Sequence, residues 1–196
     1  MRVAIFDRME ECTEAEVQRM LPLVSDQRRE QALRYKHTFG RYCCLKSWLM
    51  LSELLKTSVK GAKNPNETPR GFCYNEHGKP FLEDGPYFSI SHCKEGIAVA
   101  IDEEPIGIDI EGIRKADKDL VERVMNEEER VGMDDRKFTR LWTQKEAVVK
   151  AQGVGIVSFE QLQYILRNSG NLKLQTIEKE NYIYSIAYGK LHCFSA

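Results

Sequence analysis

The sequence predicts an α+β fold that consists of two similar halves, a pseudo-dimer. Each half reads in the same order: a strand, short helices, a long amphipathic helix and then three strands. A polar break at residues 102–105 (DEEP) separates them. We therefore expect an N-terminal α+β half at residues 1–104 and a C-terminal α+β half at residues 105–196. The shared order of elements is not accompanied by a clear repeat of residues.

The elements of the first half follow from apolar patterning and helix-start signals. Thr13, with Glu16 three positions later, has the spacing of a capping box, and Ser25 or Asp26 is placed to begin the next helix. The longest predicted helix has a wide apolar face that includes Trp48. The predicted elements are a strand at 2–6, helices at 13–23, 27–36 and 41–56, a loop at 61–70, and strands at 72–74, 87–91 and 97–101.

The second half is predicted in the same way and carries another helix-start signal. Asn126 is followed three residues later by Glu129, again the spacing of a capping box. The predicted elements are a strand at 106–110, a short helix at 119–125, a helix start at Asn126, a long helix at 138–151, and strands at 162–166, 172–176 and 183–188.

Composition and charge narrow the class of protein. The 196 residues, 42% of them hydrophobic, suffice for one domain or two small ones. A formal net charge of −1 provides no overall positive field, which argues against a nucleic-acid partner. No apolar run has the length of a membrane span, the start MRVAIFD lacks a signal-peptide core, and the six cysteines form no Cys-x-x-Cys pair. We therefore expect a cytoplasmic protein with reduced thiols and no membrane contact.

Two carboxylates lie in the apolar segment GIDIE at residues 107–111. Asp109 and Glu111 are two positions apart, so on a strand both side chains project from the same face. Such a pair is often only the solvated face of an edge strand. The isoleucines at 106, 108 and 110 favour a different interpretation, because they would bury the opposite face of the strand. Carboxylate oxygens are the ligands that Mg²⁺ prefers, so the pair is a candidate metal site.

A third carboxylate and a lysine lie in the helical segment WTQKEAVVK at residues 142–150. Glu146 and Lys150 are four positions apart and therefore share one helix face. An exposed ion pair of this kind is common in helices. The apolar residues between them favour partial burial instead. If folding brings them to Asp109 and Glu111, the three acids and the lysine would hold a divalent cation against a phosphate.

Other polar segments are candidates for binding. SISH at residues 89–92 ends a predicted strand, where binding residues are common, although a single His92 is more often structural. Cys93 is not expected to act with His92, because adjacent residues on a strand point to opposite faces. Lys79 lies on a predicted turn. The basic residues between Arg28 and Arg41 are either a solvated helix face or a phosphate contact.

Taken together, these segments resemble the 4′-phosphopantetheinyl transferase family, in its Sfp-like group. The resemblance rests on GKP at 78–80, SISH at 89–92, GIDIE at 107–111, and WTQKEA at 142–147 with Lys150. Each segment is weak evidence, but four in the same order and approximate spacing over residues 78–155 are specific. Gly153 and Gly155 also fit the turn that follows the helix. Outside this region only the basic stretch near Arg28 and the type of elements agree.

The resemblance implies a reaction and a fold. The phosphopantetheine arm of coenzyme A would pass to a serine of an apo acyl or peptidyl carrier protein, releasing adenosine 3′,5′-bisphosphate. Coenzyme A, the substrate, would bind at the seam between two similar halves. Mg²⁺ would be held by Asp109, Glu111 and Glu146. Glu146, or a water that it orients, would take the serine proton.

The resemblance also implies roles for the basic residues. Lys150 would stabilise the leaving group. Lys79, Ser91 and His92 would bind the phosphates of the nucleotide, with Arg28 and Arg41 assisting. The enzyme would be a monomer that acts on carriers with an acidic helix. Because the chain has no overall positive charge, we expect a local docking patch with apolar contacts.

The chain departs from the family pattern at particular positions. Gln31 replaces a residue that is often basic, and Val124 and Met125 follow Arg123 where aromatic residues are usual. We expect Val124 and Met125 at the edge of the docking patch. Two alternatives stay open from the residues alone. One is a metal-dependent nucleotide phosphohydrolase, which uses water as its nucleophile, and the other is a catalytically silent coenzyme A-binding module.

Overall fold

The computed structural model describes residues 1–56, 72–76, 78–83, 85–155 and 158–190. Within these ranges no helix is both long enough and apolar enough to span a membrane. The elements are, in chain order, β1 (Arg2–Phe6), η1 (Met9–Glu11), α1 (Glu14–Met20), η2 (Leu21–Leu23), α2 (Asp26–Leu33), α3 (Thr38–Lys56), β2 (Phe72–Tyr74), β3 (Pro80–Leu82), β4 (Tyr87–Cys93), β5 (Gly96–Asp102), β6 (Ile106–Gly112), α4 (Lys118–Val124), α5 (Glu127–Arg130), α6 (Asp135–Gln152), α7 (Phe159–Tyr164), β7 (Lys173–Glu178) and β8 (Tyr182–Tyr188).

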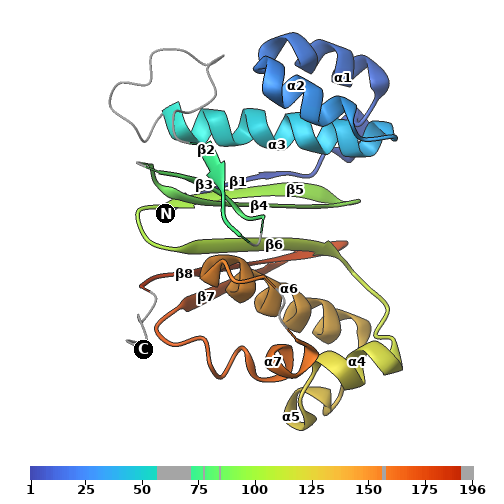
Figure 1. Ribbon diagram of the computed structural model, residues 1–196. Coiled ribbons are helices and arrows are strands. Elements are labelled where there is room, and N and C mark those ends of the chain that lie inside the picture. Colours follow the sequence, from blue (N-terminus) through green and yellow to red (C-terminus); the bar gives the residue numbers. More distant parts are fainter. Residues whose placement is uncertain (57–71, 77, 84, 156–157, 191–196) are drawn as a thin grey trace.

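Two three-stranded sheets form the centre of the molecule, and helices cover their outer faces (Figure 1). The mixture of helices and sheets is the predicted α+β class. Helices α1 to α3 lie outside the sheet β1-β5-β4, and helices α4 to α7 lie outside the sheet β6-β8-β7. Both sheets are antiparallel and have the same order, since the first strand of each pairs with the last, and the last also pairs with the one before it.

The two sheets pack face to face through a layer of apolar side chains. Ala98 and Ala100 of β5 form one side, and the isoleucines at 106, 108 and 110 of β6 form the other; all are fully buried. Burial of this apolar area favours the packing of one sheet on the other. Strand β4 also contacts β6 directly, because the hydroxyl of Ser89 accepts a hydrogen bond from the Ile108 backbone N–H at 3.0 Å.

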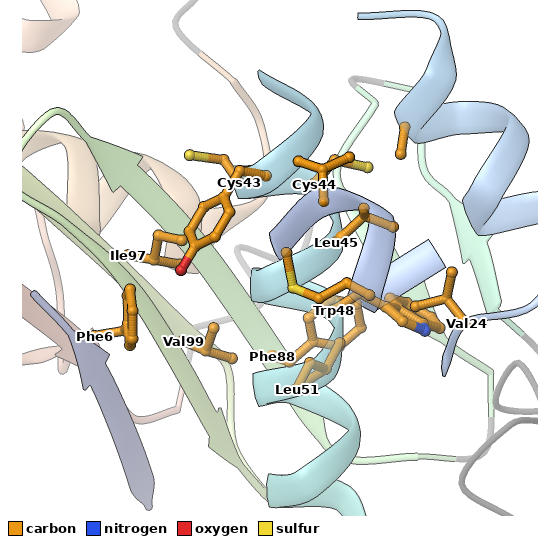
Figure 2. Packing of buried hydrophobic residues seen from close by; sticks show 14 of the residues in the cluster. Phe6, Val24, Cys43, Cys44, Leu45, Trp48, Leu51, Phe88, Ile97 and Val99 are labelled. Atoms are coloured by element: carbon orange, nitrogen blue, oxygen red, sulfur yellow. The ribbon is translucent and has the colours of Figure 1, made fainter. Parts of the chain in front are cut away.

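Helix α3 covers the outer face of the first sheet. Its Leu45, Trp48 and Leu51 lie over Ile97 and Val99 of β5 (Figure 2). Alternation along β5 explains how this strand serves two cores. Its odd-numbered residues face α3, and its even-numbered alanines face the second sheet.

Helix α6 covers the outer face of the second sheet and includes a fully buried lysine. Lys145 is 0% exposed, and its Nζ donates to the carbonyl oxygens of Leu162 at 2.6 Å and Gln163 at 3.2 Å. Nζ also pairs with Oε2 of Glu129 at 2.9 Å. These contacts tie α6 to α5 and α7 and satisfy a charge that would otherwise be costly to bury.

Gly107 allows α6 to pack closely on β6. A Cβ atom at this position would collide with the carbonyl oxygen of Ala147 and the backbone nitrogen of Ala151. Both of those atoms belong to the helix backbone, which cannot rotate away as a flexible side chain can. The absence of a side chain at residue 107 therefore sets the distance between this helix and this strand.

Most predicted elements are confirmed, with shifted ends. The caps at Thr13, Ser25 and Asn126 are present, and Asn126 with Glu129 forms a complete capping box. The predicted strand at 162–166 is wrong. Ser158 caps helix α7 there, and Leu162 and Ile165, three residues apart, face the core as on a helix. Strand β3 was not predicted, and the predicted loop at 61–70 lies outside the described residues.

We expect Gly107→Ala to destabilise the fold by about 3 kcal/mol, the upper end of the cost of overpacking, because α6 must move away from β6. Urea unfolding measures this change. Gly112→Ala on the same strand is the matched control, since the three atoms nearest to its Cβ all belong to the flexible carboxyl end of Glu95. The control should lose less than about 1 kcal/mol. Equal losses in the two variants would contradict the role assigned to Gly107.

Candidate active site

Three polar side chains from three different elements meet between β6 and α6. Oδ1 of Asp109, on β6, accepts from Nζ of Lys150 at 2.6 Å and from Oγ of Ser91 at 2.8 Å. Nζ of Lys150, on α6, also lies 3.0 Å from Oγ of Ser91, on β4. Asp109 is only 4% exposed, so the charge of Lys150 compensates that of a carboxylate that water barely reaches.

The carboxylates around this contact lie in surroundings that disfavour their charged forms. Oδ2 of Asp109 is buried and has no hydrogen-bond partner among the described residues. Burial raises the pKa of Glu111, and the charge of Asp109 raises it further. The pKa of Glu146 is raised by burial first and then by Asp109. The charge of Asp109 therefore acts on both glutamates.

These residues fit a hard divalent cation. A buried carboxylate oxygen without a donor is a ligand still available to a metal, and two further acids lie nearby. As placed, the described residues contain no group of three or more His, Cys, Asp or Glu side chains close enough to form a ready-made cage. Mg²⁺ does not require one, because it usually takes one or two carboxylates and completes its shell with water and substrate phosphates.

Glu111 forms an ion pair that the sequence did not indicate. Nη1 of Arg114 lies 3.4 Å from Oε1 of Glu111, and its guanidinium lies over the ring of Trp142, 5.2 Å from the ring centroid. Arg114 follows the end of β6, outside every segment that carries the family resemblance. No signal in the sequence singled it out, since an arginine three residues beyond a glutamate is ordinary.

Two pockets adjoin this cluster and share Pro80, Ile90 and Lys150. The smaller pocket, of about 300 Å³, is lined by residues that include Lys79, Ser89, Glu146 and Val149. The larger pocket, of about 420 Å³, is lined by residues that include Arg28, Tyr35, Tyr74, Ser91 and His92. The pockets therefore bring residues from before and after the polar break at 102–105 to Lys150.

Two residues that line the larger pocket, Arg28 and His92, contact aromatic rings beside it. The guanidinium of Arg28 lies 4.0 Å from the centroid of the Trp48 ring, and its Nη1 lies 3.8 Å from Sγ of Cys44. The ring of His92 meets Phe39 edge-on, with centroids 6.0 Å apart. Burial, followed by the charge of Lys150, lowers the pKa of His92. A cation with aromatic neighbours suits a ligand that has a phosphate and a planar base.

Two of the predicted phosphate-binding residues are engaged elsewhere. Nζ of Lys79 donates to the carbonyl oxygens of Lys150 and, at 3.4 Å, of Ile106, and burial lowers its pKa to about 8. Nε of Arg41 donates to the Tyr35 carbonyl at 2.9 Å, and its Nη1 lies 3.7 Å from Oε1 of Glu14. Arg41 lines neither pocket, whereas Lys79 lines the smaller one.

The expected docking role of Val124 and Met125 is wrong. Both side chains are 0% exposed and lie at the end of α4, in the same core cluster as Phe138 and Val148 of α6. They cannot form the edge of a docking surface, because a partner protein would not reach them. Their apolar side chains belong to the core.

Comparison with known proteins identifies the family. A sequence model described as the 4′-phosphopantetheinyl transferase superfamily matches residues 105–192. The chain is 33% identical over 140 residues to the 4′-phosphopantetheinyl transferase gsp of Aneurinibacillus migulanus, covering 68% of this chain and 57% of that relative. This match spans less than two thirds of the relative's own length.

Two relatives from Bacillus subtilis match over more of the chain. The identity is 27% over 170 residues to one 4′-phosphopantetheinyl transferase, covering 82% of this chain and 74% of the relative. It is 24% over 186 residues to 4′-phosphopantetheinyl transferase Sfp of strain 168, covering 90% and 81%. The matched region includes the strand with Asp109 and the helix with Glu146 and Lys150. This chain therefore belongs to the 4′-phosphopantetheinyl transferase superfamily, in its Sfp-like group.

Proposed function

We propose that this protein transfers the 4′-phosphopantetheine arm of coenzyme A to a serine hydroxyl of an apo acyl or peptidyl carrier protein. Adenosine 3′,5′-bisphosphate is the second product, and the reaction depends on Mg²⁺. The observation that carries the proposal is the contact of Lys150 with Asp109 and Ser91 where two pockets adjoin. Family membership supplies the reaction class.

We propose that residues 1–104 and 105–196 form the two halves of a pseudo-dimer with coenzyme A at their seam. The identical strand order of the two sheets supports this division. The pockets support the seam, because their walls combine residues on either side of the polar break at 102–105. A nucleotide in the larger pocket would bring its pyrophosphate to Lys150.

For the metal we propose Asp109, Glu111 and Glu146 as ligands. When bound there, Mg²⁺ would neutralise charge on the pyrophosphate. The orphaned Oδ2 of Asp109 and the raised pKa values of both glutamates support this assignment, since a cation would relieve each of them. The isoleucines on the opposite face of β6 pack in the core, so the packing of the strand does not depend on the acids.

We propose distinct roles for Lys150 and Glu146 in the transfer. The ammonium of Lys150 donates to the phosphate oxygens of the leaving nucleotide, which gain charge as the bond to phosphorus breaks. Glu146 takes the serine proton, directly or through one water that it orients. The serine oxygen bonds to the phosphorus, and adenosine 3′,5′-bisphosphate leaves.

Arg28, Ser91 and His92 are the proposed nucleotide contacts, because all three line the larger pocket. The exposed rings of Tyr35 and Tyr74 line the same pocket and suit the stacking of a base. Lys79 and Arg41 would reach a phosphate only by leaving the partners described above. We further propose a monomer in the cytoplasm, with the carrier protein as its partner.

One assay tests the proposed reaction. The protein is incubated with coenzyme A, Mg²⁺ and an apo carrier protein, and the carrier is examined for the added phosphopantetheinyl mass. We expect the mass to appear, and to disappear when a chelator removes the metal. Turnover of coenzyme A without a carrier would instead support a phosphohydrolase. Binding of coenzyme A with no turnover would support a silent binding module.

We expect Asp109→Ala to abolish or nearly abolish transfer, with a severe loss in Glu111→Ala as well, since both acids hold the metal. Asp109→Asn keeps the shape of the side chain and the acceptor for Ser91 but removes the charge. Its transfer rate should fall by about 100-fold or more, and this fall measures the contribution of the charge alone. Transfer rates at several Mg²⁺ concentrations measure the effect, and circular dichroism checks folding. A folded Asp109→Ala protein with near wild-type activity would refute the metal-site assignment.

We expect Glu146→Gln to lower turnover by roughly 10²–10⁴-fold, because the variant keeps the shape of the side chain and removes its proton affinity. Thermal unfolding should show that α6 survives. Glu122→Gln, an exposed position on α4, is the matched control. The outcome that counts against this role is retained turnover together with lost thermal stability, which would make Glu146 a structural ion-pair residue.

We expect His92→Ala to raise the KM for coenzyme A by about tenfold with a smaller change in kcat, as for the loss of one hydrogen bond to a charged group. Steady-state kinetics with coenzyme A and dephospho-coenzyme A identify the contact. If His92 binds the 3′-phosphate, its removal should raise the KM for dephospho-coenzyme A, which lacks that phosphate, by less than the KM for coenzyme A. Equal effects on the two substrates would exclude that phosphate as the group that His92 contacts.

A further inference from the structure

The hairpin of β2 and β3 is fastened to the C-terminal end of α6. Nδ2 of Asn75 donates to the carbonyl oxygen of Gly153 at 2.8 Å. Nζ of Lys79 donates to the carbonyl oxygen of Lys150 and, at 3.4 Å, to that of Ile106 at the start of β6. The hairpin, the helix and the strand are thereby joined at one point, although they come from three separate stretches of the chain.

The turn of the hairpin is preorganised for these contacts. Oδ1 of Asn75 accepts from the backbone N–H of Lys79 at 2.8 Å, and the Asn75 backbone N–H donates to the Lys79 carbonyl at 2.9 Å. The Asn75 carbonyl in turn accepts from the Gly78 N–H at 2.9 Å. Asn75 and Lys79 therefore hold one another in place before either of them reaches α6.

The acceptors on α6 are groups that a helix leaves unsatisfied. The last four carbonyls of an α-helix have no partner within the helix, and cations near this end are favoured by the helix dipole. Gly153 ends α6 in the left-handed conformation, with φ of 74°. A Cβ atom on Gly153 would lie 3.6 Å from both Nδ2 of Asn75 and Cδ of Lys79, so the two side chains pack directly on this turn.

We infer that Asn75 and Lys79 form a clamp that positions Lys150 for the proposed transfer. Lys150 takes part at both of its ends. Its carbonyl oxygen accepts from Lys79, and its ammonium contacts Asp109 at 2.6 Å and Ser91 at 3.0 Å. Fixing the backbone of this turn fixes the starting point of the side chain that reaches the reaction centre. Asn75 and Lys79 are positioning residues, and this inference rests on the proposed function.

The clamp predicts a different kinetic signature from a phosphate contact. A side chain that binds coenzyme A raises KM when it is removed. A side chain that only holds Lys150 in place lowers kcat, because misplacement of a group that acts in the transition state costs rate rather than binding. Asn75 lines neither pocket, so we expect its removal to leave the binding of coenzyme A largely intact.

The test compares Lys79→Met, which keeps the apolar stem, and Asn75→Ala with the wild-type protein. We expect kcat to fall by roughly 10- to 100-fold in each variant, with little change in the KM for coenzyme A. Hydrogen exchange at residues 150–153, the end of α6, should be faster in both. The matched controls are Lys173→Met and Asn168→Ala, at exposed positions away from this junction. They should leave kinetics and exchange unchanged.

The two readouts separate the clamp from the reaction that it serves. Unchanged exchange in both variants overturns the clamp, whatever the activity. Faster exchange with an unchanged kcat overturns the positioning of Lys150. A higher KM for coenzyme A in Lys79→Met, with Asn75→Ala like the wild type, assigns Lys79 to the substrate and also overturns it. If the wild-type protein has no transferase activity, faster exchange in both variants supports the clamp while the proposed function fails.

Discussion

The site depends on the close packing of α6 against β6. Gly107 permits it, because any side chain there would strike the backbone of the helix at Ala147 and Ala151. Two residues further along β6, Asp109 comes within 2.6 Å of Lys150 on the same helix. A helix held farther from the strand would leave the buried carboxylate of Asp109 without its cation, which is a costly arrangement in a protein interior.

The same packing concentrates negative charge that the protein does not fully balance. Lys150 and Ser91 share Oδ1 of Asp109, while Oδ2 is buried without a donor. The pKa values of Glu111 and Glu146 rise because the surroundings are desolvated and Asp109 lies nearby. Perturbed carboxylates of this kind are frequent at functional sites.

Sequence patterns predicted the elements better than their ends and contacts. Alternation of isoleucines with Gly107, Asp109 and Glu111 predicted a strand with the acids on one face, and the structure confirms the strand and its buried apolar face. The stretch 162–166 was wrongly predicted as a strand, because a short apolar run suits a strand or a buried helix equally well. The side chain of Ser158 accepts a hydrogen bond from the Gln161 backbone N–H, and this N-cap favours the helix.

From the residues alone, the three acids and the lysine of the proposed site could be singled out, because four short segments occur in one order and spacing although each alone is weak evidence. Family resemblance rests on those same local spacings. Only the tertiary structure decided which groups these and other side chains contact. Lys79 points to helix carbonyls, Lys145 is buried against Glu129, and Val124 fills the core. The physical reason is that a lysine stem spans several ångströms, so its partner depends on packing between elements that are distant in the chain.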